Sequence, residues 1–316
     1  MTAPGGGRGG PLDDPQASGG AATATLESAL APTAPARRWG AAGVLRHLAS
    51  NPLTAAGAVV AIVLVLVALA APLIAPHDPI AVDLPHRLRA PSSRFWFGTD
   101  EEGRDIFSRV VYGTRISLSA AAGILLIAVV VGVAVGLVAG YAGGWVDEVL
   151  MRVTDMFLAF PSLVLAMGVA ATLGASLINS IVAIGVVWWP WYARLVRGQV
   201  LRLKQEAFVE AARVAGATDR QIVLTHIVRN AMSPIVVQMS LDVGYAILTM
   251  ASLSFIGLGA QPPTPEWGAM ISVGRDYYLN QWWYVTFPGL AIFLAVMAFN
   301  FLGDGLQEAL SPETTR

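Results

Sequence analysis

Residues 206–230 read EAFVEAARVAGATDRQIVLTHIVRN and form a charged stretch between long apolar regions. We call residues 206–230 the polar island. Phe208, Ala211 and Ala215 recur at helical spacing before Gly216, a residue suited to the left-handed turn that ends many helices. The stretch therefore predicts a short helix that stops at Gly216.

A second short helix is expected after this glycine. Thr218 and Gln221 make a Thr-x-x-Gln capping box, in which each side chain caps a backbone N–H of the other residue. Leu224, Ile227 and Val228 then share one face at helical spacing. Two charged helices that join membrane spans need a partner on the water side.

The composition is that of a membrane protein. Hydrophobic residues make up 55% of the 316 residues and charged residues 13%, whereas a soluble domain carries about 25% charge. The chain has no cysteine, which excludes disulfides, thiol catalysis and cysteine-bound zinc. Its one lysine, Lys204, lies between Leu203 and Gln205, so no Gly-Lys-Ser/Thr phosphate loop exists. We expect no cofactor and no ATPase activity in this chain alone.

Uncharged runs of about 20 residues predict an all-α, polytopic membrane fold with six transmembrane helices. An even number of spans puts both termini on the same side. The spans are expected near residues 53–75, 116–141, 150–173, 179–197, 233–258 and 286–303.

Three parts are expected along the chain. Residues 1–36 are rich in Gly, Pro and Ala and predict a disordered tail. Residues 37–95 form an N-terminal segment with the first span. Residues 96–316 hold the other five spans and the loop at 200–231 that contains the polar island.

Lysine and arginine favour a cytoplasmic N-terminus. With the termini inside, 13 of the 20 basic residues lie on the inner side, although the first outer loop is unusually basic. We expect a multi-pass protein of the plasma membrane with both termini in the cytoplasm. In that first outer loop, Thr99 and Glu102 predict a second capping box and an interfacial helix before the second span.

Three interpretations of the polar island remain at this point. A DNA-binding helix-turn-helix is disfavoured because membrane spans hold both ends of the segment away from a groove. An ordinary amphipathic loop at the membrane surface is the second. The third is a docking element for a soluble protein.

The docking interpretation agrees with a family resemblance. Glu210-Ala211-Ala212, three further residues and Gly216, followed by residues 222–230, resembles the EAA loop of permease subunits in binding-protein-dependent ABC transporters. The string SLSFIGLGAQPPTP at 252–265 resembles the C-type permeases of dipeptide and oligopeptide importers. This chain departs from the family pattern at Arg229, where many relatives have proline instead of arginine. Further matching segments are 97–100, 103–105, 108–113, 139–141, 143–147, 159–162, 298–300 and 303–306, so the resemblance covers about residues 45–312.

The resemblance implies a non-catalytic subunit of an ATP-driven importer. Its expected partners are a homologous permease that shares the pathway, two ABC ATPase subunits, an extracytoplasmic substrate-binding protein and membrane lipid, with no nucleic acid. Dipeptides or oligopeptides are the expected solutes, with nickel or another small solute as alternatives. The residues expected to dock the ATPase are Glu206, Glu210, Ala211, Ala212, Gly216, Ala217, Asp219 and Ile222.

Polar residues inside the expected spans are candidates for the pathway. A carboxylate such as Asp242 costs about 2.5–3.5 kcal/mol at the bilayer centre, so it should face protein or water. It either lines the pathway or makes a structural hydrogen bond, and Asn300 is an uncharged second candidate. A proton-coupled secondary transporter that uses Asp242 is an alternative, as is a structural membrane scaffold. Both alternatives leave the polar island without a role, and ATP dependence of transport separates them from an ABC importer.

Two further patterns concern packing. Gly132, Gly136 and Gly140 form a ladder that lets helices approach closely in lipid. A tryptophan cluster in the fourth expected span predicts anchoring at the membrane interface, with substrate stacking as the alternative. That cluster contains Trp188, Trp189 and Trp191.

Overall fold

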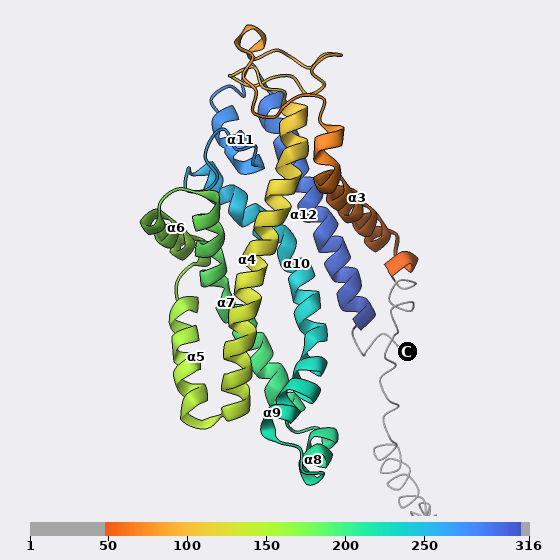
Figure 1. Cartoon of the computed structure of the whole chain (residues 1–316), viewed down its shortest axis with the longest axis vertical. Helices are drawn as coiled ribbons and strands as arrows, with labels where there is room; N and C mark the ends of the chain where they lie inside the picture. Colours follow the sequence, from red (N-terminus) through yellow and green to blue (C-terminus); the bar gives the residue numbers. More distant parts are fainter. Residues whose placement is uncertain (1–47, 311–316) are drawn as a thin grey trace, which may run out of the picture. The chain divides into compact units, whose positions relative to one another are not determined.

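The computed structural model describes residues 48–310, so the tail expected at residues 1–36 lies outside the described part. Within that part the regular elements are helical, and the one extended pairing is an isolated bridge between Thr99 and Asp105. Figure 1 shows the long helices running side by side. In chain order the elements are α3 (Pro52–Ile74), the 3-10 turn η1 (Leu84–His86), α4 (Ile106–Ala142), α5 (Gly144–Leu158), α6 (Ser162–Leu173), α7 (Leu177–Leu203), α8 (Ala207–Val214), α9 (Asp219–Gln221), the π-helical turn η2 (Ile222–Ile227), α10 (Val228–Phe255), α11 (Trp267–Gly274) and α12 (Trp283–Leu310).

The all-α membrane fold is confirmed, but the count of six spans is not. Among the described residues, four helices are long and apolar enough to cross a membrane, or five if a bent pair counts as one span. The four are α3, α4, the continuous helix Asp219–Phe255 and α12. The bent pair is α5 with α6, at 88° to each other.

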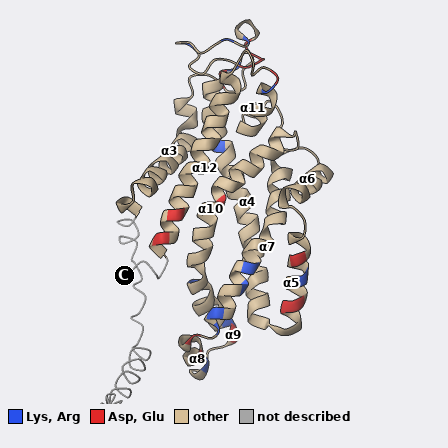
Figure 2. Ribbon diagram, turned by 180° about the vertical axis from the view of Figure 1, so that it is seen from behind, with Lys and Arg blue, Asp and Glu red and all other residues tan. Residues whose placement is uncertain are grey.

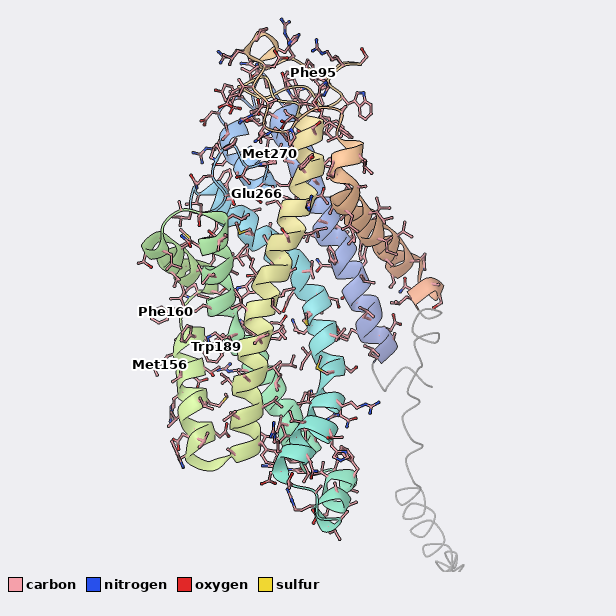
Figure 3. All side chains as sticks on the ribbon, viewed as in Figure 1. Phe95, Met156, Phe160, Trp189, Glu266 and Met270 are labelled. Carbon is pink, nitrogen blue, oxygen red and sulfur yellow. The ribbon has the colours of Figure 1, made fainter. Side chains whose placement is uncertain are left out.

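The third expected span, 150–173, is therefore a broken one. The helix α5 ends at Leu158, and α6 begins at Ser162 directly after Pro161. A proline cannot donate to the preceding turn, and it disfavours helical backbone in the residue before it. Figure 3 shows Met156 and Phe160 on the outer side of this pair, where both are exposed in the isolated chain.

The fourth expected span corresponds to α7, which is helical but not among the four strongly apolar helices. Its middle contains three tryptophans and Pro190, and many of its residues are buried by the rest of the chain. A helix covered largely by protein does not need a continuous lipid-facing apolar surface. This explains why a count from uncharged length alone overestimates the number of apolar spans.

The glycine ladder of α4 packs directly on α7, as its spacing predicts. A methyl carbon at Gly132 would lie 2.4 Å from the Cβ of Tyr192, and one at Gly136 would lie 2.5 Å from the carbonyl oxygen of Ala193. Such distances leave no room for a side chain. The close packing of α4 on α7 thus depends on these glycines.

The expected Thr99–Glu102 capping box is wrong. The helix α4 starts at Ile106, and the Asp105 carboxylate caps it by accepting a hydrogen bond from the Ser108 backbone N–H at 3.1 Å. Thr99 instead donates to the His86 carbonyl at 2.5 Å. The helix then runs without a break to Ala142, so there is no separate interfacial helix before the second span.

Charged residues are spread unevenly over the helices. Figure 2 shows them on α5, at the end of α12 and around α8 and α9, whereas α3 is free of them. The segment 75–105 packs at the opposite end of the bundle from α8 and α9 (Figure 1).

Candidate functional site

The first helix of the polar island forms as expected. Its only buried residue is Val209, which anchors α8 on the bundle. Gly216 has φ +84°, a left-handed conformation that glycine adopts without strain. The following N–H, of Ala217, donates to the Ala212 carbonyl at 3.0 Å and closes the helix end. The predicted stop at Gly216 is thus confirmed.

The second helix starts where the capping box places it but does not end as expected. The Thr218 N–H donates to Gln221 Oε1 at 2.9 Å, and the Gln221 N–H donates back to Thr218 Oγ1 at 3.4 Å. From Asp219 the chain stays helical through η2 and α10 to Phe255. The polar island is therefore one short helix followed by the first turns of a long one.

The expected docking residues occupy one compact region with unequal exposure. Glu206, Glu210, Ala211, Gly216 and Asp219 are exposed, and Ala212 and Ala217 are half-buried. Ile222 is fully buried and packs in the core. A partner that docks on this region meets two glutamates and small side chains, while Ile222 holds the region in place.

Hydrogen bonds tie the polar island to the end of α4. The Tyr141 hydroxyl donates to the Asp219 carboxylate. The Lys204 ammonium donates to the Tyr141 carbonyl at 2.7 Å and lies 5.1 Å from the centre of its ring. A movement of the island is thus linked to the long helices through Tyr141.

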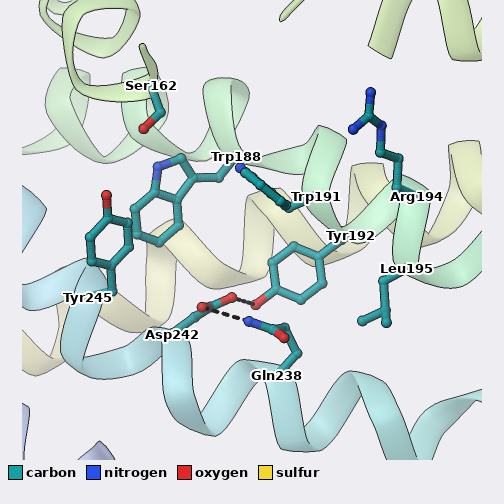
Figure 4. Close-up of a pocket in the computed structure, with 9 residues that line it drawn as sticks. All are labelled: Ser162, Trp188, Trp191, Tyr192, Arg194, Leu195, Gln238, Asp242 and Tyr245. Carbon is teal, nitrogen blue, oxygen red and sulfur yellow. Dashed lines mark hydrogen bonds between the residues drawn. The ribbon is translucent and has the colours of Figure 1, made fainter. Parts of the chain in front are cut away.

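A cavity of about 610 Å³ lies between α7 and α10, with Ser162 of α6 on its wall. Figure 4 shows Asp242 on its wall, reaching from α10 toward Tyr192 on α7. The Tyr192 hydroxyl donates to Asp242 Oδ2 at 2.6 Å, and the Gln238 amide donates to Oδ1 at 3.0 Å. The cavity is lined by Ser162, Trp188, Trp191, Tyr192, Arg194, Leu195, Gln238, Asp242 and Tyr245.

The structure separates the two expected pathway residues. Asp242 lines the cavity, whereas Asn300, half-buried on α12, is not among its lining residues. Both expected roles of Asp242 remain compatible with this geometry, because the carboxylate is hydrogen-bonded and also borders open space. Gln238 lies one helical turn before Asp242, so its spacing could have identified it. The pairing with Tyr192, 50 residues away, left no such signal.

The sequence did not predict a second set of polar residues, which lies around the start of α4. We call Asp100, Glu101, Arg104 and Arg109 the buried-charge cluster. Arg104 Nε donates to Asp100 Oδ2 at 2.6 Å, and the two side chains are 3% and 0% exposed. Burial disfavours the Arg104 charge, but Asp100, with smaller contributions from Glu101 and Glu102, outweighs it and raises the pKa of Arg104. Residues 100–104 are not helical, so the four-residue spacing that pairs side chains on a helix gave no signal for this pair.

The buried-charge cluster joins the segment 75–105 to later helices. Arg109 donates to the Pro79 carbonyl at 2.8 Å and to the Pro263 carbonyl at 3.3 Å. The Tyr284 hydroxyl at the start of α12 donates to Glu101. Nearby, Glu266 caps α11 by accepting from the Ala269 N–H at 2.9 Å, and burial raises the pKa of its carboxyl. Figure 3 shows Glu266 beside Met270 on this helix.

Comparisons with known proteins agree with this architecture. The family model described as "Binding-protein-dependent transport system inner membrane component" matches residues 132–316, and that of the "N-terminal TM domain of oligopeptide transport permease C" matches 41–91. The chain is 47% identical to the Escherichia coli (strain K12) "Probable D,D-dipeptide transport system permease protein", over 87% of this chain and 93% of the relative.

Other relatives carry different solute names. A dipeptide transport system permease protein of Alkalihalophilus pseudofirmus is 43% identical over 85% of this chain and 88% of its own length. The nickel transport system permease protein of Escherichia coli (strain K12) is also 43% identical, over 79% of this chain and 90% of its own. Among solved structures, an inward-facing MetNI methionine ABC transporter chain aligns with a TM-score of 0.54 at 21% identity, covering 65% of this chain and 98% of that one. The last similarity concerns the fold alone. With a family model over more than half of its length and relatives this similar, the chain belongs to the inner membrane components of binding-protein-dependent transport systems, the permease subunits of ABC transporters.

Proposed function

We propose that this chain pairs with a homologous permease to form the pathway of an importer for dipeptides or oligopeptides. The names of two close relatives, at 47% and 43% identity, support a peptide solute. The match of residues 41–91 to the N-terminal domain of an oligopeptide permease supports it as well. The relative named for nickel makes a small inorganic cation the second candidate.

The observation that carries the proposal is the exposed polar island. Glu206 precedes α8 and Glu210 lies on it, both are exposed, and the helix is held to the bundle by a single buried residue. An exposed, amphipathic helix tied to spans at both ends is suited to a groove on a soluble subunit. We propose that two ABC ATPase subunits dock on the polar islands of the two permeases and hydrolyse ATP for them.

The proposed orientation follows from the same assignment. If the ATPases dock on the polar island, the island and both termini lie in the cytoplasm. The segment 75–105 then faces outward, where a substrate-binding protein would deliver the solute. The arginines of the first outer loop ran against the rule that basic residues gather on the inner side. Two of them, Arg104 and Arg109, are buried in the buried-charge cluster and are not free on the surface.

Affinity purification from the native membrane tests the assembly. The full-length chain should retain a second permease and ATPase subunits in stoichiometric amounts, and proteoliposomes of that complex should take up dipeptide only with ATP and the binding protein. The control complex carries an ATPase inactivated in its own phosphate loop. Uptake that continues without ATP, driven by a proton gradient, would contradict the proposal and favour a secondary transporter.

A further inference from the structure

The carboxylate in the cavity between α7 and α10 has only neutral partners. Its oxygens accept one hydrogen bond each, from the Tyr192 hydroxyl and the Gln238 amide. A carboxylate has about four acceptor positions, so about half of its capacity is unused. No cation among the described residues forms an ion pair with Asp242.

The arginine that lines the cavity is already engaged. Arg194 lines the cavity, but its guanidinium pairs with Asp155 at 2.6 Å. Figure 4 shows the Arg194 side chain directed away from Asp242. A negative group in an apolar setting without a cation is costly, and a positive group on a bound molecule would offset that cost.

Aromatic rings form much of the remaining wall. Trp188 and Tyr245 stack with ring centroids 5.0 Å apart and planes inclined by 13°. Tyr245 and Trp191 line the cavity and are 52% and 62% exposed, so they keep open ring surface. Ring faces attract cations, most strongly when water is excluded.

We propose that this cavity binds the primary ammonium group of the transported molecule, with Asp242 as its counter-ion and the rings of Trp188, Trp191 and Tyr245 as its walls. The proposal rests on the proposed peptide transport, because a peptide presents such a group at its amino end. It assigns a recognition step to the permease itself. The lining residues include no histidine, the side chain that best suits a divalent nickel ion, so the cavity fits an organic cation better.

Binding should be measured on the full-length chain with its co-purifying membrane partners in lipid nanodiscs. The binding protein is left out, so that its own preference does not enter the result. The probes are D-alanyl-D-alanine and its N-acetyl derivative, which lacks the positive charge, and the signals are calorimetric heat and tryptophan fluorescence. We expect the free-amine peptide to bind about 10-fold more tightly, the size of a desolvated cation–ring and charge interaction.

Asp242→Asn keeps the size of the side chain and removes the charge. It should lower the affinity ratio of the two peptides well below 10, to the part that the rings contribute. Asp276→Asn, which changes an exposed acid far outside the cavity, is the matched control and should leave the ratio unchanged. Tyr245→Ala provides a second variant at a half-exposed position, and it should weaken the free-amine peptide more than the acetylated one.

Two results would overturn the proposal: equal affinity for the two peptides in the unmodified protein, or full discrimination in Asp242→Asn. ATP-dependent uptake by the same complex separates this failure from that of the proposed function. If uptake of D-alanyl-D-alanine persists while the cavity shows no preference, only the ammonium site is wrong. If the complex takes up no peptide at all, the proposed solute is wrong whatever the cavity binds.

Discussion

The buried-charge cluster and the polar island are both rich in charge, yet they hold it in opposite ways. In the cluster, Asp100 and Arg104 are almost completely covered and pair with each other. In the island, Glu206 and Glu210 stand exposed, without a cation close enough to form an ion pair among the described residues. Charge that is buried and paired fixes a structure, whereas exposed charge remains available for a partner.

The largest effect is expected when the buried pair is broken. Arg104→Met leaves Asp100 buried without its cation, and loss of one partner of a buried pair costs about 3–5 kcal/mol. Thermal unfolding of the purified chain in detergent, followed by intrinsic fluorescence, should show a strongly lowered midpoint. Arg152→Met is the control, because Arg152 and its partner Glu148 are 75% and 71% exposed. Equal midpoints for the two variants would remove the contrast between the cluster and an exposed pair.

A smaller loss of stability is expected when the glycine ladder is changed. The ladder lies on α4, the helix that runs from the buried-charge cluster to the polar island. In Gly136→Leu the new side chain meets the backbone oxygen of Ala193 and the Cβ of Val196 on α7, and overpacking typically costs about 1–3 kcal/mol. The same unfolding measurement applies. Gly168→Leu is the matched control on α6, because no atom lies within 4 Å of the position a Cβ would take there. A midpoint lowered as much by Gly168→Leu would show that the loss does not come from the α4–α7 contact.

A weaker effect is expected where the polar island is tied to α4. Tyr141→Phe removes the hydrogen bond to Asp219, and on an exposed surface this should cost less than about 1 kcal/mol. The local result should be faster amide hydrogen exchange in residues 207–221, measured by mass spectrometry. Tyr278→Phe, at a tyrosine that is 57% exposed, serves as the control. Unchanged exchange in Tyr141→Phe would mean that the island is held by Val209 and Ile222 alone.

Local signals predicted this molecule better than long-range ones. The stop at Gly216 and the capping box at Thr218 were recognised because turn and cap chemistry is contained within a few residues. The cap at Thr99 failed because that threonine pairs with Asp105 and His86 in the folded segment, a tertiary contact that outweighs a local motif. The bend before α6 shows the same limit, since the uncharged length that suggests one span does not reveal that the chain turns by 88° within it.

The residues of the candidate site also separate into those that a local sequence pattern could identify and those that it could not. Asp242 stood out by its charge in an apolar helix, and Gln238 shares its face, but Tyr192 and Trp188 come from a helix about 50 residues earlier. Only the packing of α7 against α10 brings these side chains to one cavity. The cluster of Asp100 and Arg109 likewise depends on Tyr284, which is 183 residues from Glu101 in sequence.

The smallest effect on stability, and the sharpest contrast with the cluster, is expected at Glu210. Glu210→Lys reverses an exposed charge, and exposed substitutions usually change the free energy of unfolding by less than about 0.5 kcal/mol. The unfolding midpoint should therefore stay unchanged, in contrast to Arg104→Met. If the ATPase docks on the polar island, the reversed charge should instead abolish stimulation of ATP hydrolysis by the substrate-loaded binding protein in proteoliposomes.

Glu148→Lys, an exposed reversal on α5, is the control and should leave that stimulation intact. Full stimulation in Glu210→Lys would argue against docking at this glutamate. Gly216→Trp, which places a bulky ring at the φ +84° turn, would then decide whether any part of the polar island is involved. Because the midpoint and the ATPase rate are measured on the same preparation, a loss of stimulation without a loss of stability separates a contact surface from a structural element.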